Sequence, residues 1–243
     1  MNKESNAYTF LFAAVMVITV GALLAIAATS LKPMQDVNIK NEKMQNILAT
    51  VGITDITREE AQAKFDEVIQ QAFLVNPDGT ATEDRDGAFN VDLKNELKKK
   101  VTEQKFPLFV ANNGGKKFYI IPLRGSGLWD AIWGYISLDE DMNTIKGVVF
   151  DHKGETPGLG AEITQAWFQE RFIDEKIFDA NGKLVGVTVA KGYTGGDDKE
   201  DNKVDAISGA TITGDGVTNM FVERLAHYKN FLKNQKSQLA LNN

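Results

Sequence analysis

Residues 106–123, FPLFVANNGGKKFYIIPL, decide the fold class of this 243-residue chain. Two runs rich in aromatic and β-branched residues, 106–111 and 117–123, lie on either side of a short polar segment. That segment, NNGG at 112–115, has the asparagine and glycine residues that tight hairpin turns need. The sequence therefore predicts an antiparallel β-hairpin at this place.

The same alternation continues toward the C-terminus, where short β-rich runs and turns are interleaved with two helical patterns. The first helical pattern, 161–172, is amphipathic and predicts that Ile163, Trp167 and Phe172 face the core. An order of this kind, without a βαβ repeat, predicts an α+β fold with a largely antiparallel sheet and flanking helices. The other predicted elements are strands at 135–138, 144–150 and 183–191 and a final helix at about 214–233.

Residues 8–31, YTFLFAAVMVITVGALLAIAATSL, contain no charged side chain. A helix needs roughly 20 apolar residues to cross a bilayer, so the segment predicts one transmembrane helix after a short tail at 1–7. A cleaved signal peptide is the alternative, with residues 25–27 (AIA) as its cleavage site, but signal cores usually span roughly 7–15 residues. We therefore predict a retained anchor. The flanking charges favour a cytoplasmic soluble part only weakly.

Between this span and the hairpin, residues 32–105 predict a mainly helical adapter region. Apolar residues recur at helical spacing over 61–73, and the turn NPDGT at 76–80 ends that helix. The main domain is predicted at 106–235, and a C-terminal tail at 236–243.

Composition excludes several classes of function. The chain has no cysteine, which rules out disulfides, thiolate-held iron–sulfur clusters and a cysteine nucleophile. The net charge of -6 argues against a nucleic-acid partner, which needs clustered Lys and Arg. The two histidines, His152 and His227, do not have metal-ligand spacing, so we expect no metal site. We expect His152 to be a structural hydrogen-bonding residue.

The most informative motif is DAISGAT at 205–211, between a predicted strand and the last helix. The small residues Ser208, Gly209 and Ala210 leave the hydroxyl of Thr211 accessible to a bulky reagent. The helix start just downstream offers free N–H groups and the positive end of the helix dipole, which would stabilise a phosphate attached there. On these residues alone an ordinary helix N-cap is the more frequent role.

Two glycine-rich segments accompany this motif. GETPGLG at 154–160 precedes a predicted helix, and its glycines allow the backbone to approach a ligand closely. RGSGLW at 124–129 delivers Trp129, whose ring can stack on a flat heterocycle. An ordinary Pro-Gly turn and a core tryptophan are the alternatives, and Trp133 is assigned to the core. Neither segment is a nucleotide-binding P-loop or a dinucleotide fingerprint.

Taken together, the N-terminal span, G-x-G-L-W, E-T-P-G-L-G and D-x-x-S-G-A-T resemble one family. It is the C subunit of the bacterial sodium-translocating NADH:quinone oxidoreductase, and the related G subunit of the Rnf electron-transport complex shares the FMN-binding domain. The resemblance covers nearly the whole chain and is strongest from about Gly115 to Leu232. It identifies the main domain at 106–235 as an FMN-binding domain.

The resemblance implies a covalent cofactor, FMN, joined through its phosphate to Thr211. It also implies that a separate flavin transferase, which uses FAD as donor, recognises the motif that contains this threonine. Thr213 is the competing attachment point. The residues assigned to the transferase are Asp205, Ser208, Gly209, Ala210 and Thr211, and those assigned to FMN contacts are Trp129, Thr156, Gly158, Leu159, Gly160, Ser208, Gly209 and Ala210.

The function implied by the resemblance is electron relay within a membrane complex that couples NADH oxidation and quinone reduction to sodium export. This chain would contribute neither a catalytic acid or base nor an NADH site. Its partners would be the other membrane subunits, the flavin transferase and membrane lipid, with the soluble domain on the periplasmic side of the bacterial inner membrane. An Rnf-type or other exported FMN-binding electron carrier and a non-redox membrane-tethered adapter are the two alternatives.

Overall fold

The computed structural model describes residues 5–196 and 198–241 of the chain. Residues 1–4 and 242–243, which belong to the two predicted tails, lie outside the described residues. The chain divides into two compact units, one up to Lys43 and the other from Met44 onward. The second unit contains all the strands of the described residues.

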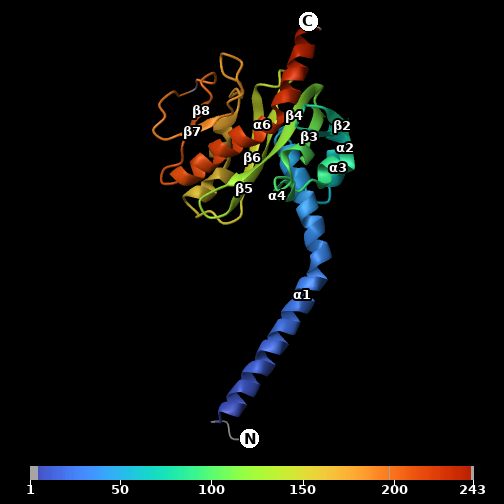
Figure 1. Cartoon of the computed structure of the whole chain (residues 1–243), viewed down its shortest axis with the longest axis vertical. Helices are drawn as coiled ribbons and strands as arrows, with labels where there is room; N and C mark the ends of the chain where they lie inside the picture. The colour runs from blue at the N-terminus through green and yellow to red at the C-terminus, as the bar shows by residue number, and fades with distance from the viewer. Residues whose placement is uncertain (1–4, 197, 242–243) are drawn as a thin grey trace. The chain divides into compact units, whose positions relative to one another are not determined.

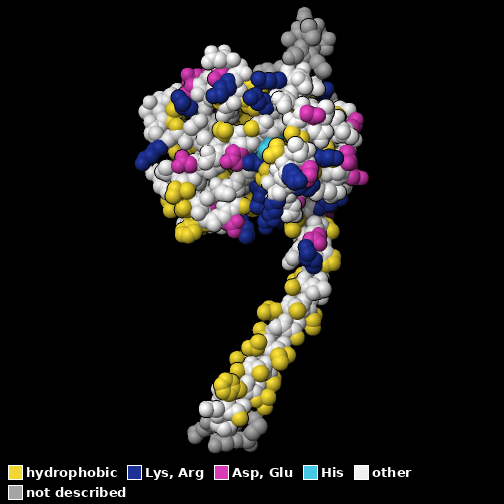
Figure 2. Space-filling model, viewed as in Figure 1, with side chains coloured by type: hydrophobic (Ala, Val, Ile, Leu, Met, Phe, Trp, Pro, Cys, Tyr) yellow, Lys and Arg dark blue, Asp and Glu magenta, His cyan; other side chains and the backbone are white. Residues whose placement is uncertain are grey.

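The first element is the long helix α1, Asn6–Ala49, which contains the predicted transmembrane span (Figure 1). Its apolar window has a mean hydropathy of 2.7 and no buried residue, and apolar side chains cover this part of the helix in Figure 2. Length and composition therefore suit a membrane span. The helix continues through Pro33 instead of ending there, and its last turns belong to the second unit.

A six-stranded antiparallel sheet forms the centre of the second unit, in the order β2-β1-β3-β4-β5-β6 (Figure 1). The predicted hairpin is confirmed, because β3 pairs with β4 and Ala111 lies opposite Phe118. The second strand pair, β5 and β6, is also confirmed. The strands are β1 Ile69–Val75, β2 Ala81–Glu83, β3 Phe106–Asn113, β4 Lys116–Ser126, β5 Ala131–Leu138 and β6 Ile145–His152.

The predicted helix over 61–73 is wrong in its second half. The helix α2 ends at Val68, and β1 begins at Ile69 and pairs with β3. The apolar residues that suggested helical spacing are β-branched or aromatic in this half, so pairing with β3 is the preferred use of them. The region at 32–105, predicted to be mainly helical, thus contributes two strands, β1 and β2, to the same sheet as the residues that follow.

Alternate residues of the central strands pack on opposite faces of the sheet, as a pleated strand requires. Leu108 and Ile121 belong to one core cluster, and Phe109 and Ile120 belong to the other. Helix α6, Thr211–Leu241, contributes Phe221 to the first cluster. The second cluster receives Met44, Ile47 and Leu48 from α1 and Phe65 from α2. The predicted α+β fold with an antiparallel sheet and flanking helices is confirmed.

Several predicted elements differ in detail. The helix expected at 161–172 is broken into η2 Gly160–Thr164, α5 Ala166–Gln169 and η3 Glu170–Phe172. Trp167 is 44% exposed and not in the core, and the Arg171 guanidinium lies over its ring, 4.8 Å from the ring centroid. Trp133 is half-buried on β5 and not fully in the core.

The strand expected at 183–191 is limited to β7, because Gly186 has a positive φ of 71° that breaks an extended run. The predicted last helix is longer at both ends than 214–233. The remaining elements are α2 Ala61–Val68, α3 Arg85–Asn90, α4 Leu93–Glu96, η1 Val101–Glu103, β7 Thr188–Ala190 and β8 Lys203–Asp205, of which the last two form a parallel pair.

Candidate functional site

A buried carboxylate, Glu155 in the turn at 154–160, joins this turn to the loop at 124–129 and to the first turn of α6. One of its oxygens accepts a hydrogen bond of 2.6 Å from the hydroxyl of Thr213, and the other accepts one of 3.0 Å from the backbone N–H of Trp129. Burial acts to raise the pKa of Glu155, but these hydrogen bonds and those from Leu128 and Asp130 outweigh it and lower the pKa. The glutamate is therefore an ionised acceptor at neutral pH.

Glycines make this convergence possible. A Cβ on Gly127 would lie 2.5 Å from a carboxylate oxygen of Glu155, and one on Gly160 would lie 2.4 Å from the other oxygen. On α6, a Cβ on Gly216 would lie 2.3 Å from the carbonyl oxygen of Ser126. Real side chains do not approach so closely, so the glycines of all three segments are needed to bring the loops against the start of α6.

The two candidate threonines have opposite environments. Thr211 is exposed at the first residue of α6, whereas Thr213 is 1% exposed and its hydroxyl is used in the bond to Glu155. The amides of the first helical turn have no acceptor within their own helix. Thr211 thus presents a reachable hydroxyl beside a positive helix end, while Thr213 holds the loops together.

Two of the predicted contact residues touch each other directly. The indole N–H of Trp129 donates a hydrogen bond of 3.2 Å to the hydroxyl of Thr156. Trp129 is 69% exposed, so its assignment to a core is excluded and its ring remains available to a ligand. The hydrogen bond fixes the plane of this ring against the turn at 154–160.

The turn at 154–160 also lies against the SGAT motif. A Cβ on Gly209 would be 2.8 Å from Cδ2 of Leu159, so the two segments are in close approach. Gly158 has a positive φ of 76° and donates its N–H to the carboxylate of Glu162 at 2.9 Å. Gly160 is buried beside Glu155, as described above, whereas Leu159 is exposed.

The first residue of the motif, Asp205, is exposed at the end of β8. The Arg171 guanidinium donates to its carbonyl oxygen at 2.7 Å and lies 3.8 Å from its carboxylate. Ser208 and Gly209 are exposed and Ala210 is buried. The Asp205 carboxylate and the Ser208 hydroxyl are therefore accessible from outside the domain.

Sequence reasoning missed Glu155 and Arg171 as organising residues. Glu155 stands inside the E-T-P-G-L-G motif, so a charged residue within a glycine-rich turn was the available signal. His152 has the structural role that was expected, because its Nδ1 accepts a hydrogen bond of 3.1 Å from the N–H of Glu155.

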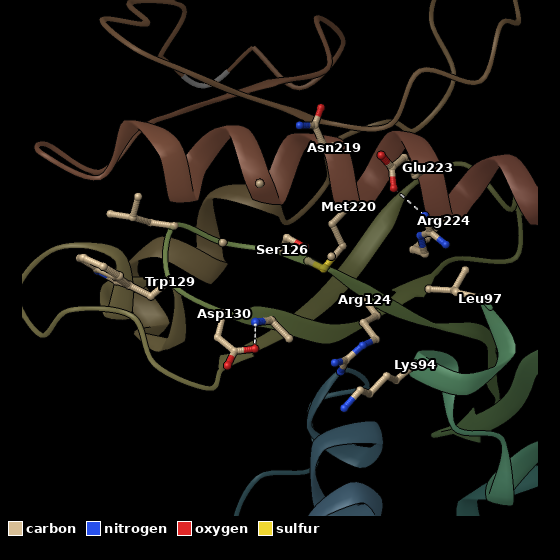
Figure 3. A pocket seen from close by; sticks show the side chains of 15 residues that line it. Lys94, Leu97, Arg124, Ser126, Trp129, Asp130, Asn219, Met220, Glu223 and Arg224 are labelled. Carbon is tan, nitrogen blue, oxygen red and sulfur yellow. Dashed lines mark hydrogen bonds and ion pairs between the residues drawn. The ribbon is translucent and has the colours of Figure 1, made fainter.

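The exposed hydroxyl, the helix start and the exposed ring of Trp129 together fit a flat cofactor attached through a phosphate. A cavity of about 530 Å³ begins at Trp129 and runs along α6 (Figure 3). It is lined by Lys94, Leu97, Arg124, Gly125, Ser126, Gly127, Leu128, Trp129, Asp130, Ala131, Gly216, Asn219, Met220, Glu223 and Arg224.

Comparisons with known proteins first identify the class of this domain. Residues 127–226 match the family described as "FMN-binding domain". This match lies inside the domain predicted at 106–235 and includes all three motifs except the first residues of RGSGLW. The site described above therefore belongs to a domain of the flavin-binding class.

Relatives then define the family. The C subunit of the Na⁺-translocating NADH-quinone reductase of Haemophilus ducreyi is 32% identical over 237 residues, with 90% of each chain covered. The C subunit of the same reductase from Pseudomonas aeruginosa is 31% identical over 238 residues. The crystal structure of the C subunit from Parabacteroides distasonis has 42% identity and a TM-score of 0.74, and the match covers 83% of this chain and 96% of that one. This chain belongs to the family of C subunits of the Na⁺-translocating NADH-quinone reductases.

Proposed function

We propose that the hydroxyl of Thr211 carries FMN as a phosphoester, and that the chain relays electrons inside a Na⁺-translocating NADH-quinone reductase. The domain match supports FMN as the cofactor, and the relatives' names support the complex. A covalently attached flavin cannot dissociate, so it suits a fixed carrier between redox centres. When bound, FMN supplies the redox chemistry, and the protein supplies position and electrostatics.

The observation that carries this proposal is the contrast between Thr211 and Thr213. The hydroxyl of Thr211 is exposed, and that of Thr213 is buried and bound to Glu155. Attachment joins the Thr211 Oγ to the phosphorus of the FMN half of FAD. The pyrophosphate bond of FAD breaks, AMP leaves, and the hydroxyl proton is released. Such a transfer needs an accessible threonine, which only Thr211 of the two provides.

Each neighbouring residue has a role in this account. The first turn of α6 offers N–H donors to the phosphate oxygens. Trp129, held by Thr156, and Leu159 offer apolar surface to the ring system. The exposed Asp205 and Ser208 are the parts of the motif that the flavin transferase can read before the flavin is attached.

The apolar helix α1 and the names of the relatives support a proposal for the placement of the chain. We assign α1 as a single membrane anchor, with the second unit on the periplasmic side of the bacterial inner membrane. The partners are then the other membrane subunits of the same complex, a flavin transferase during maturation, and membrane lipid around the span. Sodium export is a property of the complex, because the apolar window of α1 has no charged residue that could bind the ion.

A pair of variants tests the attachment point. The wild-type chain and its Thr211→Ala and Thr213→Val variants are each co-expressed with the flavin transferase and denatured in a gel. We expect flavin fluorescence in the wild type and in Thr213→Val, and none in Thr211→Ala. Fluorescence that persists in Thr211→Ala would contradict the proposal. A wild-type chain with the unmodified intact mass would favour the non-redox adapter instead.

A further inference from the structure

The cavity beside Trp129 is lined by two cationic side chains, Arg124 and Lys94, that form no direct ion pair in the part of the chain that the structure describes. The side chains of Arg124 on β4 and Lys94 on α4 both line it, and Figure 3 draws their nitrogen-bearing ends turned toward the same side. Among residues 5–196 and 198–241, neither side chain has an ion pair or hydrogen bond. Two positive charges therefore remain available in one recess.

The acids of the same cavity are already paired. The Asp130 carboxylate lies 2.8 Å from the Lys153 ammonium, and its pKa is lowered, first by that hydrogen bond. The Glu223 carboxylate lies 2.6 Å from the Arg224 guanidinium. The charge of Lys94 also lowers the pKa of Asp130, but by less than the hydrogen bond from Lys153 does. Because each acid has a closer cation as its direct partner, the net positive charge of the recess comes from Arg124 and Lys94.

A third cation, Arg224, is held in the wall of the cavity. It is 8% exposed, and its Nε has no hydrogen-bond partner. One terminal nitrogen lies 3.1 Å from Nε2 of His227, whose pKa is lowered to about 4 by burial and then by Arg224. The histidine is therefore neutral at physiological pH and adds no charge. The Nε–H of this buried guanidinium is a donor without an acceptor, and a bound anion or a water can supply one.

We propose that this cavity is a phosphate-binding site, distinct from Thr211, that shares only Trp129 with the residues assigned to FMN contacts. Two unpaired cations match the two negative charges of a phosphate monoester, and Arg and Lys are the side chains that bind phosphate best. The hydroxyl of Ser126 and the amide of Asn219 also line the cavity and can donate to the remaining oxygens. The proposal does not depend on where, or whether, FMN is attached.

The test is calorimetric titration of the full-length chain in detergent with inorganic phosphate. The titration is made at pH 8 and low ionic strength, because salt screens exposed charges. We expect saturable binding in the flavin-loaded chain and in the flavin-free Thr211→Ala variant alike. Two charge-assisted hydrogen bonds are lost in the double variant Lys94→Gln/Arg124→Gln, which should weaken binding about ten-fold or more.

Two control variants distinguish a loss of charge in the cavity from a general effect on charge or folding. Lys98→Gln/Arg58→Gln removes the same charge from exposed residues that do not line the cavity, and it should bind phosphate as the wild type does. Lys94→Arg/Arg124→Lys keeps both charges and should retain binding. Absence of saturable binding, or an equal loss in the two double Gln variants, would overturn the proposal. Binding in the flavin-free chain alone would assign the cavity to the flavin and would overturn it as well.

Discussion

Glu155 and Thr213 lie 58 positions apart in the chain, yet a hydrogen bond of 2.6 Å joins the buried carboxylate to the buried hydroxyl. Through this bond the turn at 154–160 is fixed to the first turn of α6. The same carboxylate holds the backbone of Trp129. Thr211 lies two residues before Thr213, so the bond between Glu155 and Thr213 helps to fix the position of Thr211.

The first prediction separates Thr213, which binds Glu155, from Thr211, the proposed attachment point. Thr213→Val leaves a Glu155 oxygen buried without its donor, and such a loss costs about 1–3 kcal/mol of unfolding free energy. Thr211→Ala removes an exposed hydroxyl and should change stability by less than about 0.5 kcal/mol. Urea unfolding of both variants without flavin measures the two values. Equal destabilisation of the two would show that Thr213 has no special structural role.

The second prediction concerns the contact between α6 and the loop at 124–129. Gly216→Ala places a Cβ against the Ser126 carbonyl, where it would be 2.3 Å away without rearrangement. Overpacking of this kind costs about 1–3 kcal/mol, measured by urea unfolding. Gly154→Ala is the matched control, because a Cβ there meets nothing within 4 Å. If Gly216→Ala is as stable as Gly154→Ala, the close approach of helix and loop is not real.

The third prediction is a loss of stability in mild acid through His227. Burial, and then the charge of Arg224, lower its pKa from 6.5 to about 4. As the pH falls, His227 therefore takes up a proton in the unfolded chain before it does so in the folded chain. The contribution of His227 to folding stability is complete above pH 6.5 and is lost toward pH 4. The full shift corresponds to about 3 kcal/mol. His227→Gln, which does not titrate, should flatten this part of the stability profile, and an unchanged slope would refute the assignment.

The fourth prediction has the opposite sign and concerns Glu175. Its side chain is 1% exposed, and burial raises its pKa from 4.5 to about 7 although Lys199 lies 3.4 Å away. The folded chain keeps the proton of Glu175 to a higher pH than the unfolded chain does. The contribution of this group to folding stability is therefore complete below pH 4.5 and is lost as the pH rises through 7. As the pH rises from 4.5 to 7, the unfolding free energy of Glu175→Gln should therefore increase by up to roughly 3 kcal/mol relative to that of the wild type. A variant whose relative stability does not depend on pH would contradict the shift.

The fifth prediction locates the N-terminal limit of the stable unit. A fragment that starts at Met44 keeps Ile47 and Leu48, which are fully buried. A fragment that starts at Gly52 loses them and also loses the Thr50 carbonyl, which accepts a bond of 2.6 Å from Ser137. Removal of several buried side chains should cost more than about 4 kcal/mol. Thermal unfolding of the two fragments compares them, and equal stability would exclude this packing.

Part of the fold was predictable because local sequence and tertiary structure agree there. The NNGG turn between two β-rich runs specifies the hairpin without help from other segments, and the uncharged N-terminal segment specifies its helix. Residues 69–75 are different. Their apolar spacing fits a helix, and only the pairing with β3, more than 30 positions later, makes them a strand.

The candidate site likewise has features that the local sequence indicates and features that only tertiary contacts decide. Small residues around Thr211 and the glycines of the turn at 154–160 indicated a place where a ligand approaches the backbone. The choice between Thr211 and Thr213 could not be made from spacing, because both are suitable helix caps. The observation that favours Thr211 is the burial of Thr213 and its bond to Glu155, a contact between segments that are distant in the sequence.

The most direct measurement of the central claim is tandem mass spectrometry of the chain purified from its native membrane. A proteolytic peptide that contains residues 205–213 should carry one FMN, less one water, and fragmentation should place it on Thr211. The same modification on Thr213, or an unmodified peptide, would contradict the account.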